Sequence, residues 1–350
     1  MSGRRMLPPA VRGRLTAGSP LILLVTVGVV LALAFGLASV STALHEFVIS
    51  TLVNLIIVVG LYIFIGNSGV VSFGQISFMA VGAYTTGLLT VTPERKQFLL
   101  PDLPKFVSDL HLGTFPAMVV VAVGVGLLAA VMGLPLMRLS GIAASIATLS
   151  MLIVVNVVIV QTTSWTGGNQ AFIGVPLTAT TGVAAACVVV AIVVAFLFER
   201  SAMGLRLRAS REDEQAARAA GISVVFERTV AFGLSGGVIA LAGAVYAHFI
   251  GSFDPFSFYL GLTFITLAML VVGGLFTLIG AVVGTIVLST VQEILGRLES
   301  GDGVGPIHLQ LHDGTTDVVL ALVVIAVMIF RPGGIMARGV DRRRRRRSTT

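Results

Sequence analysis

Apolar runs of about twenty residues recur along nearly the whole chain, separated by short polar or glycine-rich breaks. Each run is long enough to cross the roughly 30 Å hydrocarbon core of a bilayer as one helix. The pattern therefore predicts an all-α polytopic membrane protein with about ten transmembrane helices. They are expected at residues 20–40, 46–65, 71–91, 116–137, 142–161, 177–198, 229–249, 259–275, 277–297 and 316–330.

Two places in this pattern leave alternatives open. The run from Leu21 to Leu37 follows basic residues, as a cleaved signal peptide would. It exceeds the usual signal core of about 7 to 15 residues, which favours a first span. The break at Gly273 and Gly274 is so short that one or both of the adjoining helices can be broken or partial.

Basic residues are distributed unevenly between the two sides of the membrane. If the N-terminus is cytoplasmic, the inner segments hold 19 of the 23 Lys and Arg residues. Retained cytoplasmic loops collect Lys and Arg, so this asymmetry indicates an even number of spans with both termini in the cytoplasm.

Composition supports the same class. Hydrophobic residues make up 56% of the 350, charged residues 11%, and the mean hydropathy is +1.00, more apolar than a soluble domain can bury.

Three parts are expected: a basic cytoplasmic tail at 1–19, a transmembrane domain at 20–335 that includes the inner loop 199–228, and an Arg-rich cytoplasmic tail at 336–350. The tail's Arg342–Arg347 run suits anionic membrane lipids, whereas the lack of interleaved aromatic residues argues against nucleic acid.

Small residues at helical spacing predict close helix packing. Gly233 and Gly237 form one such pair, and Gly280 and Gly284 form another. This spacing lets helix backbones approach each other within a membrane. Packing inside the bundle is favoured over a subunit interface.

Reactive and ionisable groups are scarce in the spans. Ion-coupled transporters usually bury such groups, so coupling to an ion is not expected. His308 and His312 stand four residues apart without a third ligand, and no metal site or catalytic residue is predicted. The two lysines, Lys96 and Lys105, follow Arg95 and Pro104, so there is no phosphate-binding loop and no cofactor is expected on this chain.

One charged segment, Gly204–Ile222, stands out from the apolar background. Ser210 with Asp213 predicts a helix start, acidic residues fill the first turn, and Gly221 predicts a left-handed stop. The result is a helix of about ten residues, roughly 15 Å long. So short a helix needs support, and its small alanines suit docking into a groove. A passive loop on the membrane surface is about equally consistent with these residues.

Several ordered motifs give the chain a resemblance to a known family. Besides the charged segment, these are "SFGQISFMAVGAY" at 72–84, "TGGNQAFIGVP" at 166–176, "FDPFSF" at 253–258 and "LVVGGLFTLIGAVVGTIVL" at 270–288. Together they resemble the permeases of ATP-binding cassette (ABC) importers for branched-chain amino acids, most closely the M-type subunit. Phe276 departs from the family, which often has another glycine there.

This resemblance implies a transport subunit of the bacterial inner membrane and no enzyme activity in this chain. Its implied partners are a second homologous permease, two ATPase subunits that use ATP and Mg, and an extracytoplasmic solute-binding protein. The charged segment would be the ATPase-coupling loop. Its expected coupling residues are Gly204, Arg208, Arg211, Glu212, Glu214, Ala217 and Gly221.

Branched-chain or other small apolar amino acids are the expected solutes, because a neutral pathway suits a zwitterion. Urea or short amides, and a channel or facilitator that works without ATP, remain alternatives. The candidate pathway residues are Ser72, Gln75, Ser77, Tyr84 and Thr85. The candidate contacts to the binding protein, which can equally form a tight turn, are Thr166, Gly167, Gly168 and Asn169.

Overall fold

A computed structural model of the chain describes residues 20–38, 42–300, 314–331 and 333–336. The predicted tail at 1–19, all of the predicted tail at 336–350 except Met336, and His308 and His312 lie outside these residues. The helices are α1 (Pro20–Ala38), α2 (Thr42–Leu61), the π-helix η1 (Tyr62–Gly66), α3 (Ile76–Thr90), α4 (Pro93–Leu99), α5 (Lys105–Ser108), α6 (Thr114–Leu136), α7 (Gly141–Gln161), α8 (Thr163–Thr166), α9 (Thr181–Arg200), α10 (Ala202–Glu212), α11 (Glu214–Ala219), α12 (Val224–Ile250), the 3-10 helix η2 (Pro255–Phe258), α13 (Leu260–Gly273), α14 (Leu278–Glu299) and α15 (Thr315–Phe330). The strands are β1 (Phe172–Ile173) and β2 (Ser252–Phe253).

Every predicted span coincides with a helix. Within the described ranges, seven helices are long and apolar enough to cross a membrane, and three shorter apolar helices fill the remaining predicted spans. The predicted all-α polytopic fold is confirmed. The number of spans that cross a bilayer and the side on which each terminus lies stay predictions.

Four predicted starts differ from the structure by four or five residues. The second span begins earlier, at Thr42 rather than at 46, and so does the seventh, at Val224 rather than at 229. The third and the sixth begin later. The third span begins at Ile76 rather than at 71, because the preceding loop is held by α7: the Phe73 amide donates to Thr148 Oγ1 at 3.3 Å. The sixth begins at Thr181 rather than at 177, because the chain before it runs against the end of α12, where the Val175 amide donates to the Gly251 carbonyl at 3.2 Å.

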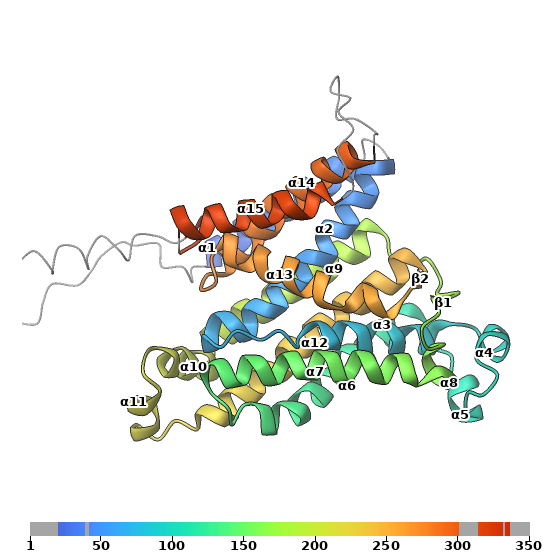
Figure 1. The fold of residues 1–350 in the computed structure, drawn as a ribbon, viewed down its shortest axis with the longest axis horizontal. Helices are drawn as coiled ribbons and strands as arrows, with labels where there is room; N and C mark the ends of the chain where they lie inside the picture. The colour runs from blue at the N-terminus through green and yellow to red at the C-terminus, as the bar shows by residue number, and fades with distance from the viewer. Residues whose placement is uncertain (1–19, 39–41, 301–313, 332, 337–350) are drawn as a thin grey trace, which may run out of the picture.

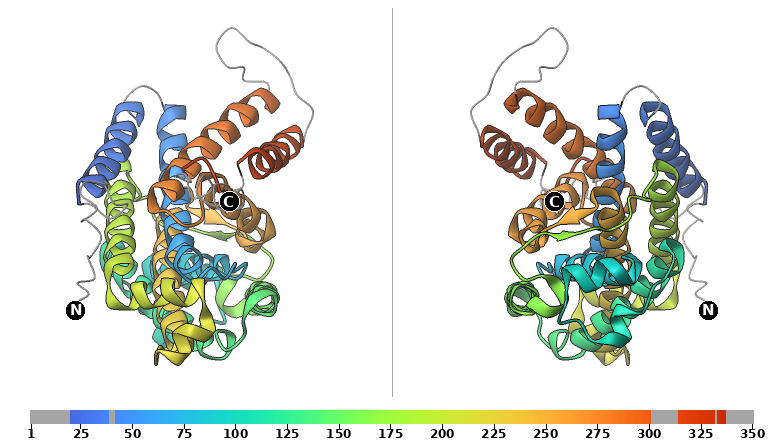
Figure 2. Two further views of the ribbon diagram at one scale, coloured as in Figure 1. Left: turned by 90° about the vertical axis from the view of Figure 1, so that its left-hand side faces the viewer. Right: turned by 90° about the vertical axis from the view of Figure 1, so that its right-hand side faces the viewer.

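The bundle has two distinct ends. In Figure 1, α10 and α11 lie at one end, while α4, α5, α8 and the two strands lie at the other. We call these the insert end and the outer end; the charge distribution predicts the first to be cytoplasmic. Figure 2 shows α1 and α9 on one side of α2, and α14 with α15 on the other.

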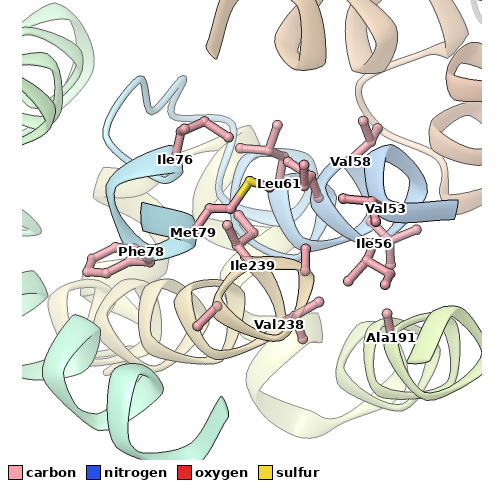
Figure 3. Packing of buried hydrophobic residues seen from close by; sticks show 14 of the residues in the cluster. Val53, Ile56, Val58, Leu61, Ile76, Phe78, Met79, Ala191, Val238 and Ile239 are labelled. Carbon is pink, nitrogen blue, oxygen red and sulfur yellow. The ribbon is translucent and has the colours of Figure 1, made fainter. Parts of the chain in front are cut away.

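Helices α2, α3 and α12 form the centre of the core. Figure 3 shows Met79 of α3 and Ile239 of α12 meeting Leu61 of α2, and all three side chains are buried. The backbones touch directly: a Cβ on Gly243 would collide with the carbonyl oxygen of Met79. These contacts hold α3 rigidly in the middle of the bundle, surrounded on most sides.

The predicted glycine pairs pack inside the chain, as expected. A Cβ on Gly237 would lie 2.6 Å from the Ala122 carbonyl oxygen of α6. Gly273 of α13 lies so close to Gly280 of α14 that any side chain would strike the Gly280 carbonyl. The break at Gly274 is confirmed, and it joins two continuous helices rather than broken ones.

Candidate functional site

The charged segment forms two helices, α10 and α11, rather than the single predicted helix. The predicted cap was wrong: Ser210 is buried inside α10, where its hydroxyl donates to the Leu207 carbonyl at 2.7 Å. The start lies earlier because Ser201 caps α10 by accepting from the Gly204 amide at 3.1 Å. Asp213, three residues after Ser210, caps α11 instead, with Oδ1 accepting from the Ala216 amide at 2.9 Å.

The glycines at either end of this segment have different roles. Gly221 ends α11 with φ +81°, which confirms the predicted left-handed stop. Gly204 allows α10 to fold back on α9, since a Cβ there would collide with the Phe198 carbonyl. Gly204 therefore shapes the start of the insert and is buried within the chain.

Arg208 points back to the spanning helices. Its Nη1 lies 3.2 Å from Glu199 Oε1, and its Nη2 donates to the Glu199 carbonyl at 2.5 Å. Arg206 and the buried Glu227 of α12 form a second ion pair at 3.4 Å. The two pairs fasten α10 to α9 and to α12.

Glu214 fastens α11 in the same way. Its carboxylate pairs with Arg218 at 2.7 Å and with the buried Arg228 of α12 at 2.9 Å. Hydrogen bonds from Arg218 are the largest cause of a lowered pKa at Glu214, and Arg228 adds to it.

The outward face of the insert carries mostly small and polar side chains, together with the exposed Leu205 and Met203 at the start of α10. Glu212 projects from it with 76% of its side chain exposed. Its other exposed residues include Ala209, Gln215, Ala216 and Ala219. The predicted coupling residues thus divide: Glu212 faces outward, Ala217 is buried, and Arg211 turns toward the spanning helices.

The candidate pathway residues lie along α3 and the loop before it. Ser72, Gln75, Ser77 and Tyr84 are buried, and only Thr85 is half-buried. Among the described residues, nothing bonds to the Ser72 hydroxyl, either end of the Gln75 amide, or the Tyr84 hydroxyl. Ser77 differs, because its hydroxyl donates to the Gly74 carbonyl at 2.6 Å.

One buried polar residue on this helix was missed. Thr86 is fully buried and its hydroxyl has no partner in the described part of the chain. An unpaired buried polar group costs about 1–3 kcal/mol, so a run of them on one helix is a candidate ligand site. In the sequence, Thr86 could have been identified as a candidate because it is polar and directly follows the candidate Thr85.

Aromatic rings cover the outer half of α3. Tyr84 packs edge-on against Phe172 of β1, Phe253 of β2 and Phe258 of η2, with ring centroids 5.7, 5.1 and 6.5 Å away. We call these four residues the outer aromatic cluster. Sequence analysis missed its phenylalanines, although they stand in the two outer motifs at 166–176 and 253–258.

The segment that carries Phe172 is anchored beyond the strand pair. His248 of α12 is buried, with Nδ1 2.8 Å from the Pro176 carbonyl oxygen and 3.2 Å from the Thr178 hydroxyl. The 172–178 segment therefore lies across the end of α12 and holds the aromatic cluster in place.

The glycine-rich outer loop forms a tight turn. Thr166 is buried, with its hydroxyl donating to the Ile159 carbonyl at 2.6 Å, and Gly167 and Gly168 have φ of +78° and +69°. These three residues serve the turn, and a role in binding a partner stays a prediction. Asn169, which follows them, is exposed.

Comparison with known proteins identifies a family. Residues 55–330 match the sequence model described as "Branched-chain amino acid transport system / permease component". The chain is 24% identical to the high-affinity branched-chain amino acid transport system permease protein LivM of Salmonella typhimurium, over 96% of this chain and 79% of that protein. The LivM of Escherichia coli K12 shows the same identity and coverage.

A second set of relatives matches a shorter region. The autoinducer 2 import system permease protein LsrC of Salmonella paratyphi B is 31% identical over 41% of this chain and 39% of that protein. No solved structure matches the chain at a significant level.

Proposed function

The chain belongs to the permease component family of branched-chain amino acid transport systems, and we propose that it translocates branched-chain or other small apolar amino acids. It is an ABC importer permease, a multi-pass protein of the inner membrane and a transport subunit rather than an enzyme.

The observation that carries the proposed substrate class is the set of buried, unpaired polar side chains on α3 and the loop before it. Gln75, Ser72 and Tyr84 offer an amide and two hydroxyls without a fixed charge. A zwitterionic amino acid is neutral overall, so such groups can bind its carboxylate and ammonium without a buried counter-ion. The surrounding core is apolar, which suits an aliphatic side chain.

Energy for transport would come from partner subunits. We propose that two ATPase subunits, which use ATP and Mg, bind to this permease and to a second, homologous permease. On this chain, the ATPase would dock on the outward face of α10 and α11. The small side chains of that face, such as Ala209 and Ala216, leave room for a close approach. Docking there would let closure of the ATPases move the insert.

The outer aromatic cluster would act as the extracytoplasmic gate. Its phenylalanines lie on Tyr84, itself a proposed ligand, on the side of the outer end, where an extracytoplasmic binding protein would deliver the solute. Exposed residues near the glycine turn, such as Asn169, are the proposed contacts to that protein. Opening would require Phe172 and Phe253 to separate from Tyr84.

Uptake by proteoliposomes tests this function. Radiolabelled leucine should accumulate only when the permease pair, the ATPases, ATP and the binding protein are all present. Uptake by the purified chain alone would instead support an ATP-independent facilitator. A competition series with valine, alanine, urea, acetamide and autoinducer 2 would rank the solutes; autoinducer 2 is included because of the partial match to LsrC.

A further inference from the structure

We propose that Arg211 is a positioning residue that transmits movement of the insert to the spanning helices, by joining the α2–α3 connection to the α13–α14 turn. This inference rests on the proposed function. It assigns to Arg211 an inward role, within this chain, instead of a contact with the ATPase.

Arg211 holds the end of α2 directly. Its Nη1 donates to the carbonyl of Gly66, the last residue of η1, at 2.7 Å. The stem of the side chain also packs on the connection, since a Cβ on Gly69 would lie 2.5 Å from Arg211 Cγ. A shift of α10 along its axis would therefore push or pull the chain between α2 and α3.

The same guanidinium reaches a second connection. Arg211 Cζ lies 4.4 Å from the centroid of the Phe276 ring, in the turn between α13 and α14. The Phe276 side chain is 55% exposed, so its ring lies at the surface of the bundle, where the guanidinium can reach it. Its contact with Arg211 gives a physical reason for the residue at which the sequence departs from the family pattern.

The two connections also touch each other. A Cβ on Gly66 would lie 2.8 Å from the Leu275 carbonyl oxygen. On the far side of the turn, the Ile335 amide donates to the Val272 carbonyl at 2.8 Å. Arg211 thus sits at the edge of one contact layer that includes the ends of α2, α13 and α15.

The end of α2 has a structure suited to such movement. Residues Tyr62–Gly66 form a π-helix, a local irregularity that often occurs at functional sites. The Tyr62 side chain lies near Glu199, which also holds Arg208 of α10. The insert therefore approaches this irregular turn at Tyr62, through Glu199, and is bonded to its end at Gly66 through Arg211.

Neighbouring residues on α10 connect the two faces of the insert. Arg211 donates from Nη1 to the Gly66 carbonyl, while its Nη2 lies 3.0 Å from Oε1 of Glu212, whose side chain is 76% exposed on the outward face. Successive helical residues differ by about 100° in direction, so one turn of α10 can contact an ATPase on one face and the spans on the other.

The test is the number of ATP molecules hydrolysed per leucine imported by the complete complex in proteoliposomes. Arg211→Gln should leave assembly and ATP hydrolysis in place and raise this ratio by about two- to thirtyfold, the range that coupling substitutions commonly produce. Phe276→Leu should raise the ratio of ATP hydrolysed to leucine imported as well. Phe276→Tyr keeps an aromatic face for the guanidinium and should keep the wild-type ratio.

A matched control lies on α9. Arg200 Cζ is 4.3 Å from the Phe196 ring centroid, a similar pair confined to one helix, so Arg200→Gln should leave the ratio unchanged. A wild-type ratio in both Arg211→Gln and Phe276→Leu would overturn the inference. If Arg211→Gln fails to assemble, the Phe276→Leu and Phe276→Tyr pair decides alone. Failure of the proposed function would appear differently, as no ATP-dependent leucine uptake by the wild-type complex.

Discussion

The rings of Phe172 and Phe253 stack across the antiparallel pair of β1 and β2, with centroids 5.6 Å apart and planes inclined by 17°. Their strands come from loops about eighty residues apart in sequence, yet both rings lie on Tyr84. Separating these two rings would therefore remove part of the cover of Tyr84, which Phe258 also contacts.

A reversible disulfide should lock this gate. Directly opposed residues on antiparallel strands have Cα atoms about 4.5–5.5 Å apart, a distance that a disulfide can span. With the only cysteine, Cys187, replaced by serine, the double variant Phe172→Cys and Phe253→Cys should lose ATP-dependent uptake on oxidation and regain it on reduction. Uptake that is equal in both redox states would show that the strands need not separate.

The two single variants provide the control. In the same Cys187→Ser background, Phe172→Cys alone or Phe253→Cys alone lacks a second cysteine in the chain and cannot form the lock. Uptake by each single variant should be equal in the two redox states.

Replacing Gln75 should affect stability and transport in opposite directions. Gln75→Leu removes a buried amide that has no partner in the described part of the chain, so the free energy of unfolding should rise by about 1–3 kcal/mol. Leucine uptake should fall, because the amide is a proposed solute ligand. Thermal unfolding in lipid nanodiscs and uptake kinetics measure the two effects.

Thr90→Val provides the comparison on the same helix. Thr90 is buried, and its hydroxyl already donates to the Thr86 carbonyl at 2.9 Å. Its loss should lower the free energy of unfolding by about 0.5–1.5 kcal/mol and spare uptake. Normal uptake by Gln75→Leu would remove Gln75 from the proposed pathway.

The contact between α3 and α12 should not tolerate even one methyl group. Gly243→Ala places a Cβ against the Met79 carbonyl, so we expect a loss of about 1–3 kcal/mol in the free energy of unfolding. Gly124→Ala on α6 has no atom within 4 Å of the new Cβ and should be neutral or stabilising by up to about 1 kcal/mol. Equal stabilities of the two variants would contradict the close packing of α12.

Acid should loosen the second helix of the insert. The pKa of Glu214 is lowered by hydrogen bonds from Arg218 and Arg228, so its folded-state pKa lies below the ordinary value of 4.5. The ionised Glu214 carboxylate stabilises the folded state fully when the pH is above that ordinary pKa. This stabilisation is lost as the pH falls through the folded-state pKa. Hydrogen exchange of residues 214–219 should quicken in this acidic range, and Glu214→Gln should abolish the pH dependence.

Several features could be predicted because their causes are local. Each span needs about twenty apolar residues to satisfy its backbone groups inside a bilayer, and this requirement is visible in the sequence without any tertiary contact. The break at Gly274 and the stop at Gly221 follow from glycine's own conformational range. The ordered motifs supplied the family in the same way.

Other features depend on segments that are distant in sequence. Ser210 and Asp213 both suit a helix cap, and only the packing of α10 against α9 decided that the cap is Asp213. Sequence assigned Arg211 to an external partner, whereas Gly66 and Phe276, more than sixty residues away on either side, turn it inward.

The sequence by itself thus determined which segments form long apolar helices, where they are interrupted and which family they form, since apolar length, glycine and charge act over a few neighbouring residues. Only the tertiary structure decided which polar groups on α3 remain unpaired and which rings cover Tyr84. Those outcomes depend on the distances between side chains of different helices and loops, and these distances exist only once the bundle has packed.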